Sequence, residues 1–204
     1  YGGVIQAQER VDTANVVCMV NRDILNDELI SDVEHHSLVK SVKEEKSILF
    51  WKVSYGETDY NNPVYVRELP SGYRLFNDEG TGFLEKTPKL NQGEIYITQG
   101  MKTNFSCEIG EILTIDTEFG AYDFQIMGII EEPEMGASVI GWKNIFIGHV
   151  DFEKMYKELG GLEEQTESVS SLMTLVSIYK KDGCQLTDGK FARQINLDTG
   201  IADM

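Results

Sequence analysis

The sequence predicts an α+β fold in which helices pack against a mixed, mainly antiparallel sheet. Helix and strand patterns are interspersed along the chain without the regular alternation that builds a parallel sheet. Residues 112–116 and 122–130 alternate as strands and are joined by the short turn 118–121, which predicts an antiparallel hairpin. With 204 residues, of which 41% are hydrophobic, the chain can bury a core, and we expect one domain over residues 1–204.

The N-terminal region predicts a helix, a strand and a second helix. Residues 3–13 carry apolar side chains at roughly helical spacing, and the apolar run 15–20 predicts a buried strand. Asp23 is expected to cap the next helix. Its inward face is formed by Leu25, Leu29, Ile30 and Val33. His35 and His36 end it, where partly cationic side chains are favourable at the negative end of the helix dipole.

The middle of the chain predicts short strands separated by charged and turn-forming residues. The charged run 43–46 separates a strand over residues 47–55 from a preceding short strand or loop. Residues 56–63 have turn chemistry, and residues 64–69 predict another strand. The loop 77–88 is long for a connection. If the chain forms two small lobes, this loop is the natural boundary.

The second half predicts strands at residues 94–98, 145–147 and 172–179, and a short helix at 99–107. Asp151 is expected to cap a helix that Gly160 and Gly161 end. Thr187 or Asp188 is expected to cap a final helix with Phe191 and Ile195 on its inward face.

The charge balance limits the partners. The chain has 34 acidic and 18 basic residues, giving a net charge of -16. Such a surface repels phosphate backbones and anionic headgroups, so we expect no nucleic-acid partner. No stretch approaches the roughly 20 consecutive apolar residues of a membrane helix. The chain starts at Tyr1 without an initiator methionine or a signal peptide, and we expect a processed or excised piece.

The three cysteines, Cys18, Cys107 and Cys184, are far apart in sequence and cannot all pair with one another. Thiols that pack as small hydrophobic residues are the simpler interpretation. One disulfide with one free thiol stays open.

No catalytic site is expected. Nucleophilic catalysis requires a Cys or Ser within hydrogen-bond reach of a His. Apart from the adjacent His35 and His36, the chain has one histidine, His149, and no GxSxG motif. His149 with Cys107 or Cys184 is the candidate pair, and the sequence predicts that the protein is not an enzyme.

Metal and cofactor sites are not expected either. There is no HExxH and no paired CxxC. Residues 59–62 and 77–79 offer oxygen ligands for calcium but lack the spacing of an EF-hand, so solvated turns are the simpler interpretation. Gly136 and Gly141 are not followed by a helix pattern and lie near glutamates, which disfavours a phosphate site.

The segment that follows residues 122–130 combines loop-forming and apolar residues. Pro133 and two glycines prevent a helix, yet the segment carries a large apolar surface. These side chains either pack back onto the sheet or contact a partner. Phe83 is a further aromatic residue on a long connection. The candidate contact residues are therefore Phe83, Met135, Val139, Ile140 and Trp142.

Three successive segments resemble a known family. They are residues 89–98 (KLNQGEIYIT), 105–115 (FSCEIGEILTI) and 123–133 (DFQIMGIIEEP). Their order and spacing resemble the extracytoplasmic domain of FtsX-like, MacB-type ABC transporter permeases. Residues 132–143 resemble a segment of a Firmicutes-like branch of these permeases, and the resemblance covers about residues 90–159.

The resemblance implies a MacB-like periplasmic core fold at the outer side of the cell membrane. It implies a non-catalytic domain that couples cytoplasmic ATP hydrolysis to export, or to the handling of a substrate or partner outside. The implied partners are a separate cytoplasmic ATPase subunit, a second permease copy and an extracellular substrate or protein. Transmembrane helices would flank these 204 residues. The alternative is a secreted or surface-attached module that binds a ligand or peptide without a transport role.

Overall fold

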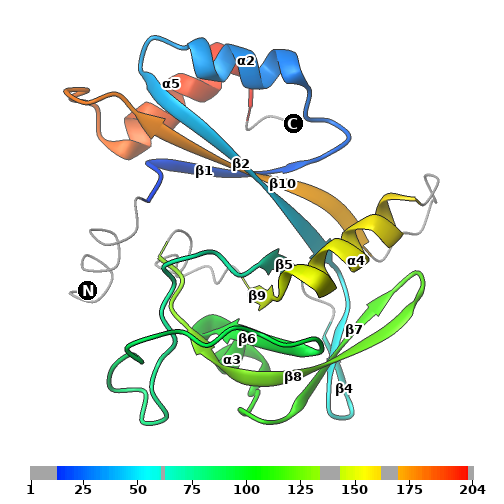
Figure 1. Cartoon of the computed structure of the whole chain (residues 1–204). Helices are drawn as coiled ribbons and strands as arrows, with labels where there is room; N and C mark the ends of the chain where they lie inside the picture. The colour runs from blue at the N-terminus through cyan, green and yellow to red at the C-terminus, as the bar shows by residue number, and fades with distance from the viewer. Residues whose placement is uncertain (1–12, 61–62, 134–142, 162–169, 202–204) are drawn as a thin grey trace. The chain divides into compact units, whose positions relative to one another are not determined.

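The computed structural model describes residues 13–60, 63–133, 143–161 and 170–201 (Figure 1). Its elements, in chain order, are β1 (Val16–Asn21), α2 (Asp27–His35), β2 (Val39–Phe50), β3 (Val53–Tyr55), β4 (Thr58–Tyr60), β5 (Val64–Glu68), β6 (Glu94–Thr98), α3 (Gln99–Phe105), β7 (Ile112–Thr117), β8 (Gly120–Ile130), β9 (Asn144–Ile147), α4 (His149–Gly160), β10 (Ser170–Lys180) and α5 (Asp188–Thr199).

The described strands confirm the α+β prediction. Their hydrogen-bonding order is β1-β10-β2-β5-β9-β6-β8-β7-β3-β4. The pairs β5/β9 and β6/β8 are parallel, while β1/β10, β2/β5, β6/β9, β7/β8, β3/β7 and β3/β4 are antiparallel. The sheet is therefore mixed and mainly antiparallel, and β7 and β8 form the expected hairpin. Within the described residues, no helix is long and apolar enough to cross a membrane.

The described chain divides into two compact units. Residues 47–171 belong to the larger unit, and the described residues before 47 and after 171 belong to the smaller unit. The strands β2 and β10 each contribute residues to both units. The loop 77–88 lies within the larger unit.

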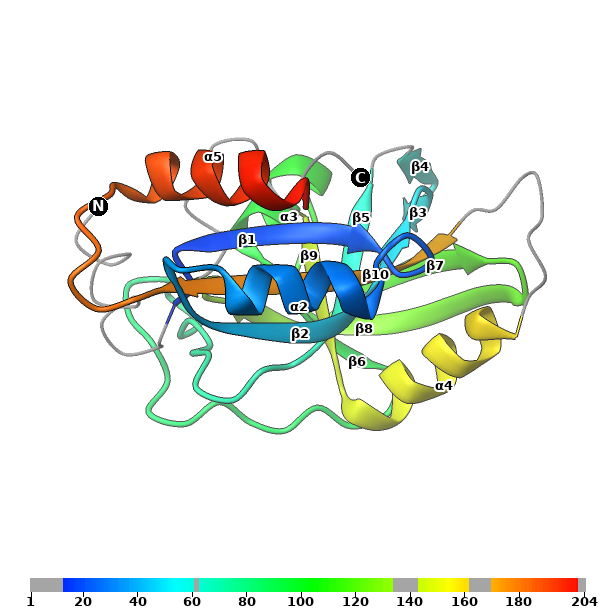
Figure 2. The same ribbon diagram turned by 90° about the horizontal axis from the view of Figure 1, so that it is seen from above.

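The smaller unit packs two helices on one face of its strands. Figure 2 shows α2 and α5 above β1, β10 and the first part of β2. Their buried apolar residues form one cluster, which includes Leu29, Val33, Val176, Phe191 and Ile195. This packing confirms the inward faces that the sequence predicts for both helices.

The helix caps differ in part from the prediction. Thr187 precedes α5, as expected. However, α2 is capped by Asn26, whose side chain accepts a hydrogen bond from the amide of Leu29 at 2.8 Å. Asp23 lies in the preceding turn, where its amide bonds the side chain of Asn21. Asp151 is inside the first turn of α4 and accepts a hydrogen bond from the amide of Gly93 at 2.8 Å. Both aspartates therefore stabilise neighbouring turns instead of capping a helix.

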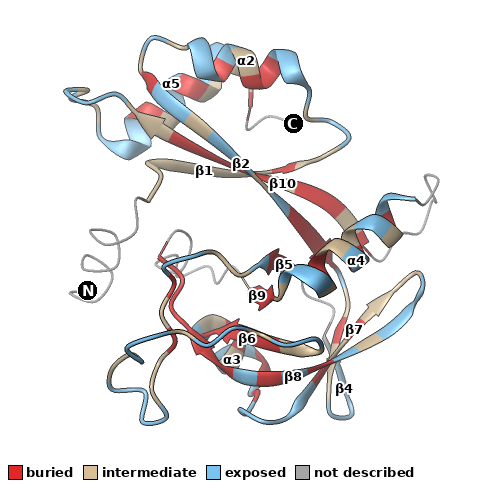
Figure 3. Ribbon diagram, in the orientation of Figure 1, coloured by how far each residue is buried: buried red, intermediate tan, exposed pale blue. Residues whose placement is uncertain are grey.

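The charged run 43–46 does not interrupt β2, contrary to the prediction. The strand continues from Val39 to Phe50, and the break comes at Trp51 and Lys52 instead. Figure 3 shows that the buried residues of β2 gather at its C-terminal end. Lys43, Glu44 and Lys46 are exposed along the strand, so these three side chains do not carry the desolvation cost that would end it.

A bulge in β8 lets a loop pack onto the larger unit's strands. Ile126 pairs with Ile95 but Gly128 pairs with Tyr96, so Met127 is an extra residue between them. A Cβ atom on Gly128 would lie 2.9 Å from Cδ1 of Leu75. Glycine at this position leaves room for Leu75, which is buried in a cluster with Tyr73, Tyr96, Ile130 and Phe146.

We expect the substitution Gly128→Ala to destabilise the fold by about 1–3 kcal/mol, because Leu75 must move out of a packed position. The control is Gly189→Ala in α5, where a Cβ meets nothing within 4 Å and helix propensity favours alanine. Urea denaturation of both variants checks the prediction, and equal stability of the two would contradict it.

Candidate functional site

The segment that carries Met135, Val139, Ile140 and Trp142 lies outside the described residues. The residues on either side of it are described. Glu131 and Glu132 follow β8, and Asn144 begins β9. Together with residues from β5 and the loop after it, they form a buried polar cluster at the base of this segment.

Glu132 is the centre of the cluster. Its Oε2 lies 3.5 Å from Nη1 of Arg67 and accepts a hydrogen bond from Nδ2 of Asn144 at 3.0 Å. Its Oε1 accepts a hydrogen bond from the hydroxyl of Tyr73 at 3.1 Å. The side chains of Arg67 and Glu132 are each only 2% exposed. The ring of Phe146 lies 5.4 Å from the Arg67 guanidinium carbon, so the pair sits in apolar surroundings.

The burial of this ion pair makes its geometry important. Removing two charges from water costs several kcal/mol per ion, which good geometry and additional hydrogen bonds must offset. Tyr73 and Asn144 supply such bonds to the carboxylate. Among the described residues, Oδ1 of Asn144 is buried and has no hydrogen-bond partner. The cluster therefore holds Glu132 and Asn144, which flank the segment in sequence, against Arg67 of β5 and Tyr73.

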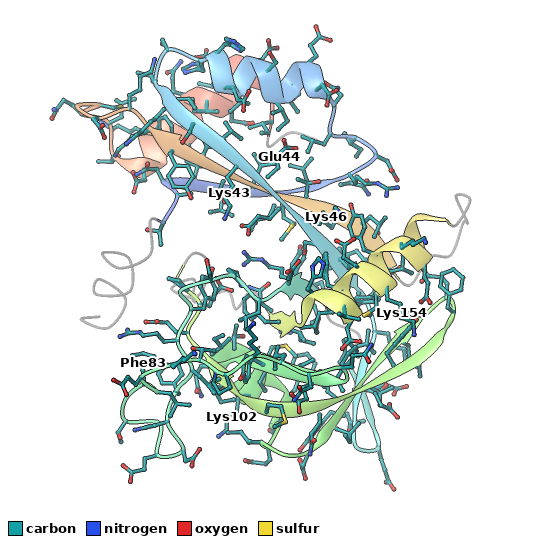
Figure 4. The ribbon with its side chains drawn as sticks, in the orientation of Figure 1. Lys43, Glu44, Lys46, Phe83, Lys102 and Lys154 are labelled. Atoms are coloured by element: carbon teal, nitrogen blue, oxygen red, sulfur yellow. The ribbon has the colours of Figure 1, made fainter. Side chains whose placement is uncertain are left out.

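Glu131 connects the cluster to Phe83. Its carboxylate accepts two hydrogen bonds from Arg74, at 3.0 and 3.1 Å. The guanidinium carbon of Arg74 lies 3.8 Å from the centre of the Phe83 ring. Phe83 also packs against Phe76, with ring centres 4.5 Å apart. Figure 4 shows Phe83 on its loop in the larger unit.

Phe83 is therefore linked through one ion pair to Glu131, which shortly precedes the 134–142 segment in sequence. Phe83 is half-buried, and its ring is held by Arg74 and Phe76. The sequence did not identify Arg67, Tyr73, Arg74 and Asn144 as partners of Glu131 and Glu132. A lone arginine inside an otherwise apolar strand was the available signal for Arg67, because such a residue needs a buried carboxylate.

A cavity of about 370 Å³ lies beside the same loop. Its lining includes Phe76, Asp78 and Glu79 from the loop, Lys102 from α3 and Ile109. A second cavity of about 390 Å³ is lined by residues 89–92, the start of α4 and the end of β5. Both cavities are partly open to solvent and therefore do not enclose a small molecule completely.

The candidate catalytic residues have other environments. Nδ1 of His149 lies 3.1 Å from the carboxylate of Glu68, and the imidazole is 69% exposed. Cys107 is buried, and burial with the nearby charge of Glu108 raises its thiol pKa to about 11. The three cysteines are free thiols. A neutral buried thiol is a poor nucleophile at physiological pH.

The residues weighed as calcium ligands have structural partners. Oδ1 of Asn77 accepts hydrogen bonds from the amides of Thr81 and Gly82 and so shapes a turn. Asp59 bonds Ser54 and Lys52, and these contacts lower its pKa. In the described parts of the chain, no group of three or more His, Cys, Asp or Glu side chains could hold a metal ion.

No protein-family profile and no curated protein sequence matches the chain. Among solved structures, the chain is similar to a domain of a protein from Porphyromonas gingivalis that is assigned as a permease. The TM-score is 0.38 and the identity 10%, over 84% of this chain and 68% of that one. A likeness at this level carries no argument about function.

We expect Glu132→Gln to lower the free energy of unfolding by about 3–5 kcal/mol, because it leaves the buried guanidinium of Arg67 without a countercharge. The neighbouring change Glu131→Gln is the matched control. Its partner Arg74 is partly exposed, so a loss of about 1 kcal/mol or less is expected. Denaturant titrations measure both, and equal losses would show that the buried pair has no special role.

The raised pKa of Cys107 predicts a loss of stability at high pH. The thiol pKa is 9.0 in an unfolded chain and about 11 here, so between these values the unfolded state loses the proton first. Stability is therefore unaffected by this group below pH 9 and falls as pH rises toward 11. Comparing unfolding free energies of wild type and Cys107→Ala across this range isolates the effect. Parallel pH profiles would contradict it.

Proposed function

We propose that the chain is the non-catalytic extracytoplasmic domain of an FtsX-like, MacB-type ABC transporter permease. In this role it couples ATP hydrolysis in the cytoplasm to export, or to the handling of a substrate or partner outside the membrane. A separate ATPase subunit, a second permease copy and an extracellular substrate or protein would be its partners. The observation that carries the proposal is the placement of both described ends in one unit.

Both ends of the described chain belong to the smaller unit. Near its start, Nδ2 of Asn15 donates to Oδ1 of Asp188, the first residue of α5, at 3.1 Å. The last described residue, Ile201, follows the 12 residues of α5, which span about 18 Å. The described chain therefore enters and leaves through one unit, which is compatible with a domain inserted between two membrane helices.

The segments that resemble the permease family support the proposal. Residues 89–98 end in β6, residues 105–115 run from the end of α3 into β7, and residues 123–133 contain β8. These strands are neighbours in the order β6-β8-β7. The three segments thus build one continuous part of the sheet, which agrees with their common origin in a single structural motif.

The connection between the units suits mechanical coupling. The chain passes from one unit to the other within two strands, β2 and β10, and we propose that a displacement is transmitted along them. Glu131 and Glu132, which precede the 134–142 segment, are held by a partly exposed ion pair with Arg74 and a buried one with Arg67. We propose that this region and Phe83 contact the extracellular partner.

The side of the membrane can be tested in the full-length protein in intact cells. Asp182, whose side chain is 90% exposed, is replaced by Cys after Cys18, Cys107 and Cys184 are replaced by Ala. We expect a membrane-impermeant maleimide to label D182C in intact cells, with the cytoplasmic ATPase subunit unlabelled.

The matched control retains Cys107 alone, which is buried and should stay unlabelled. Labelling of D182C only after cells are lysed would overturn the proposal. Recovery of the protein from the culture medium, free of membrane segments, would instead support the secreted binding module.

A further inference from the structure

The two ends of the sheet are protected to different degrees. At one end, β4 has only three residues, and Asp59 within it is paired with Lys52. Short, charged edge strands resist pairing with other chains. At the other end, β1 has six residues with the sequence VVCMVN, without a charge or a proline. Within the described residues, no strand pairs with its outer edge.

The backbone register shows which groups of β1 face this edge. The backbone amide of Arg22 donates a hydrogen bond to the carbonyl of Leu172. These two opposing residues therefore form a hydrogen-bonded pair of the ladder. In an antiparallel ladder, hydrogen-bonded and non-hydrogen-bonded pairs alternate. Val16, Cys18 and Val20 therefore direct their amides and carbonyls toward β10. The amides and carbonyls of Val17 and Met19 point outward, where a new strand would bind.

The helix α5 lies over the place that such a strand would take. Figure 2 shows α5 along the outer side of β1, on the side away from β10. The contact of Asn15 with Asp188 confirms that α5 and β1 are neighbours.

We propose that the outer edge of β1 binds an extended segment of a partner protein, which adds a strand to the sheet beneath α5. Backbone hydrogen bonds to Val17 and Met19 supply the recognition, as in other cases of strand addition. The segment would be uncharged and rich in β-branched residues, because β1 offers apolar neighbours on both faces. This surface is independent of the transporter proposal and of the region around Phe83.

A second copy of the chain fits this edge poorly. Two-fold pairing of β1 with its symmetry mate would place both α5 helices over the same two strands, on the same face. Adjacent strands are about 4.8 Å apart, whereas packed helices need about 8–10 Å. A single strand without its own helix layer avoids this clash, which is why a peptide segment is the occupant that the geometry favours.

The test uses peptides of about ten residues, selected by phage display on the whole 204-residue chain and then synthesised. Binding is measured by calorimetry to wild type, Met19→Pro and Met19→Thr. Proline removes an amide that points away from β10, so the β1/β10 pairing is retained. We expect about tenfold weaker binding to M19P, and binding to M19T within about threefold of wild type.

Amide hydrogen exchange of the wild-type chain provides a second measurement that does not depend on the fold of M19P. The selected peptide should slow exchange at Val17 and Met19. The proposal is overturned if no peptide is selected, if M19P binds as well as M19T, or if protection appears elsewhere. It is also overturned if both amides are protected without peptide, since residues 1–12 or a second copy would then cover the edge.

Discussion

The buried ion pair between Arg67 and Glu132 is the constraint on which the larger unit depends. A charged pair with almost no exposure is stable only where every surrounding group is in place. Arg67 comes from β5, Glu132 follows β8, and Asn144 starts β9, so one carboxylate fixes three strand ends. Tyr73 brings in the loop that covers the sheet. Displacement of any of these segments would weaken the pairing of a buried charge, which lowers the stability of the fold.

This arrangement would give the proposed contact region a rigid foundation. Loops carry recognition residues well when the scaffold beneath them holds their ends. Here the glutamates next to the 134–142 segment are anchored by Arg67 and Arg74, and Arg74 also holds the ring of Phe83. Gly128 permits the close approach of Leu75 that keeps this loop on the sheet. Apolar packing and ion pairing thus act on the same region.

The sequence identified the elements whose signals are local. Alternation, turn residues and helical periodicity located β6, the β7/β8 hairpin and the inward faces of α2 and α5. Prediction from the sequence failed where contacts between residues distant in sequence determine the structure. The charged run in β2 continues as strand because it is paired in a sheet. Asp151 accepts a hydrogen bond from the amide of Gly93 instead of capping α4. Of the candidate site, Phe83 was identified, but its link to Glu131 through Arg74 depends on long-range pairing.

The shared strands have a consequence for synthesis on the ribosome. The described residues of the larger unit all lie between residues 47 and 171, so this part can fold as soon as it emerges. The smaller unit cannot, because β10 separates β1 from β2 in the sheet and is translated last of the three. Until that final strand appears, the first two strands and α2 have no common partner. The nascent chain must therefore keep this apolar N-terminal part out of wrong associations while the rest is made.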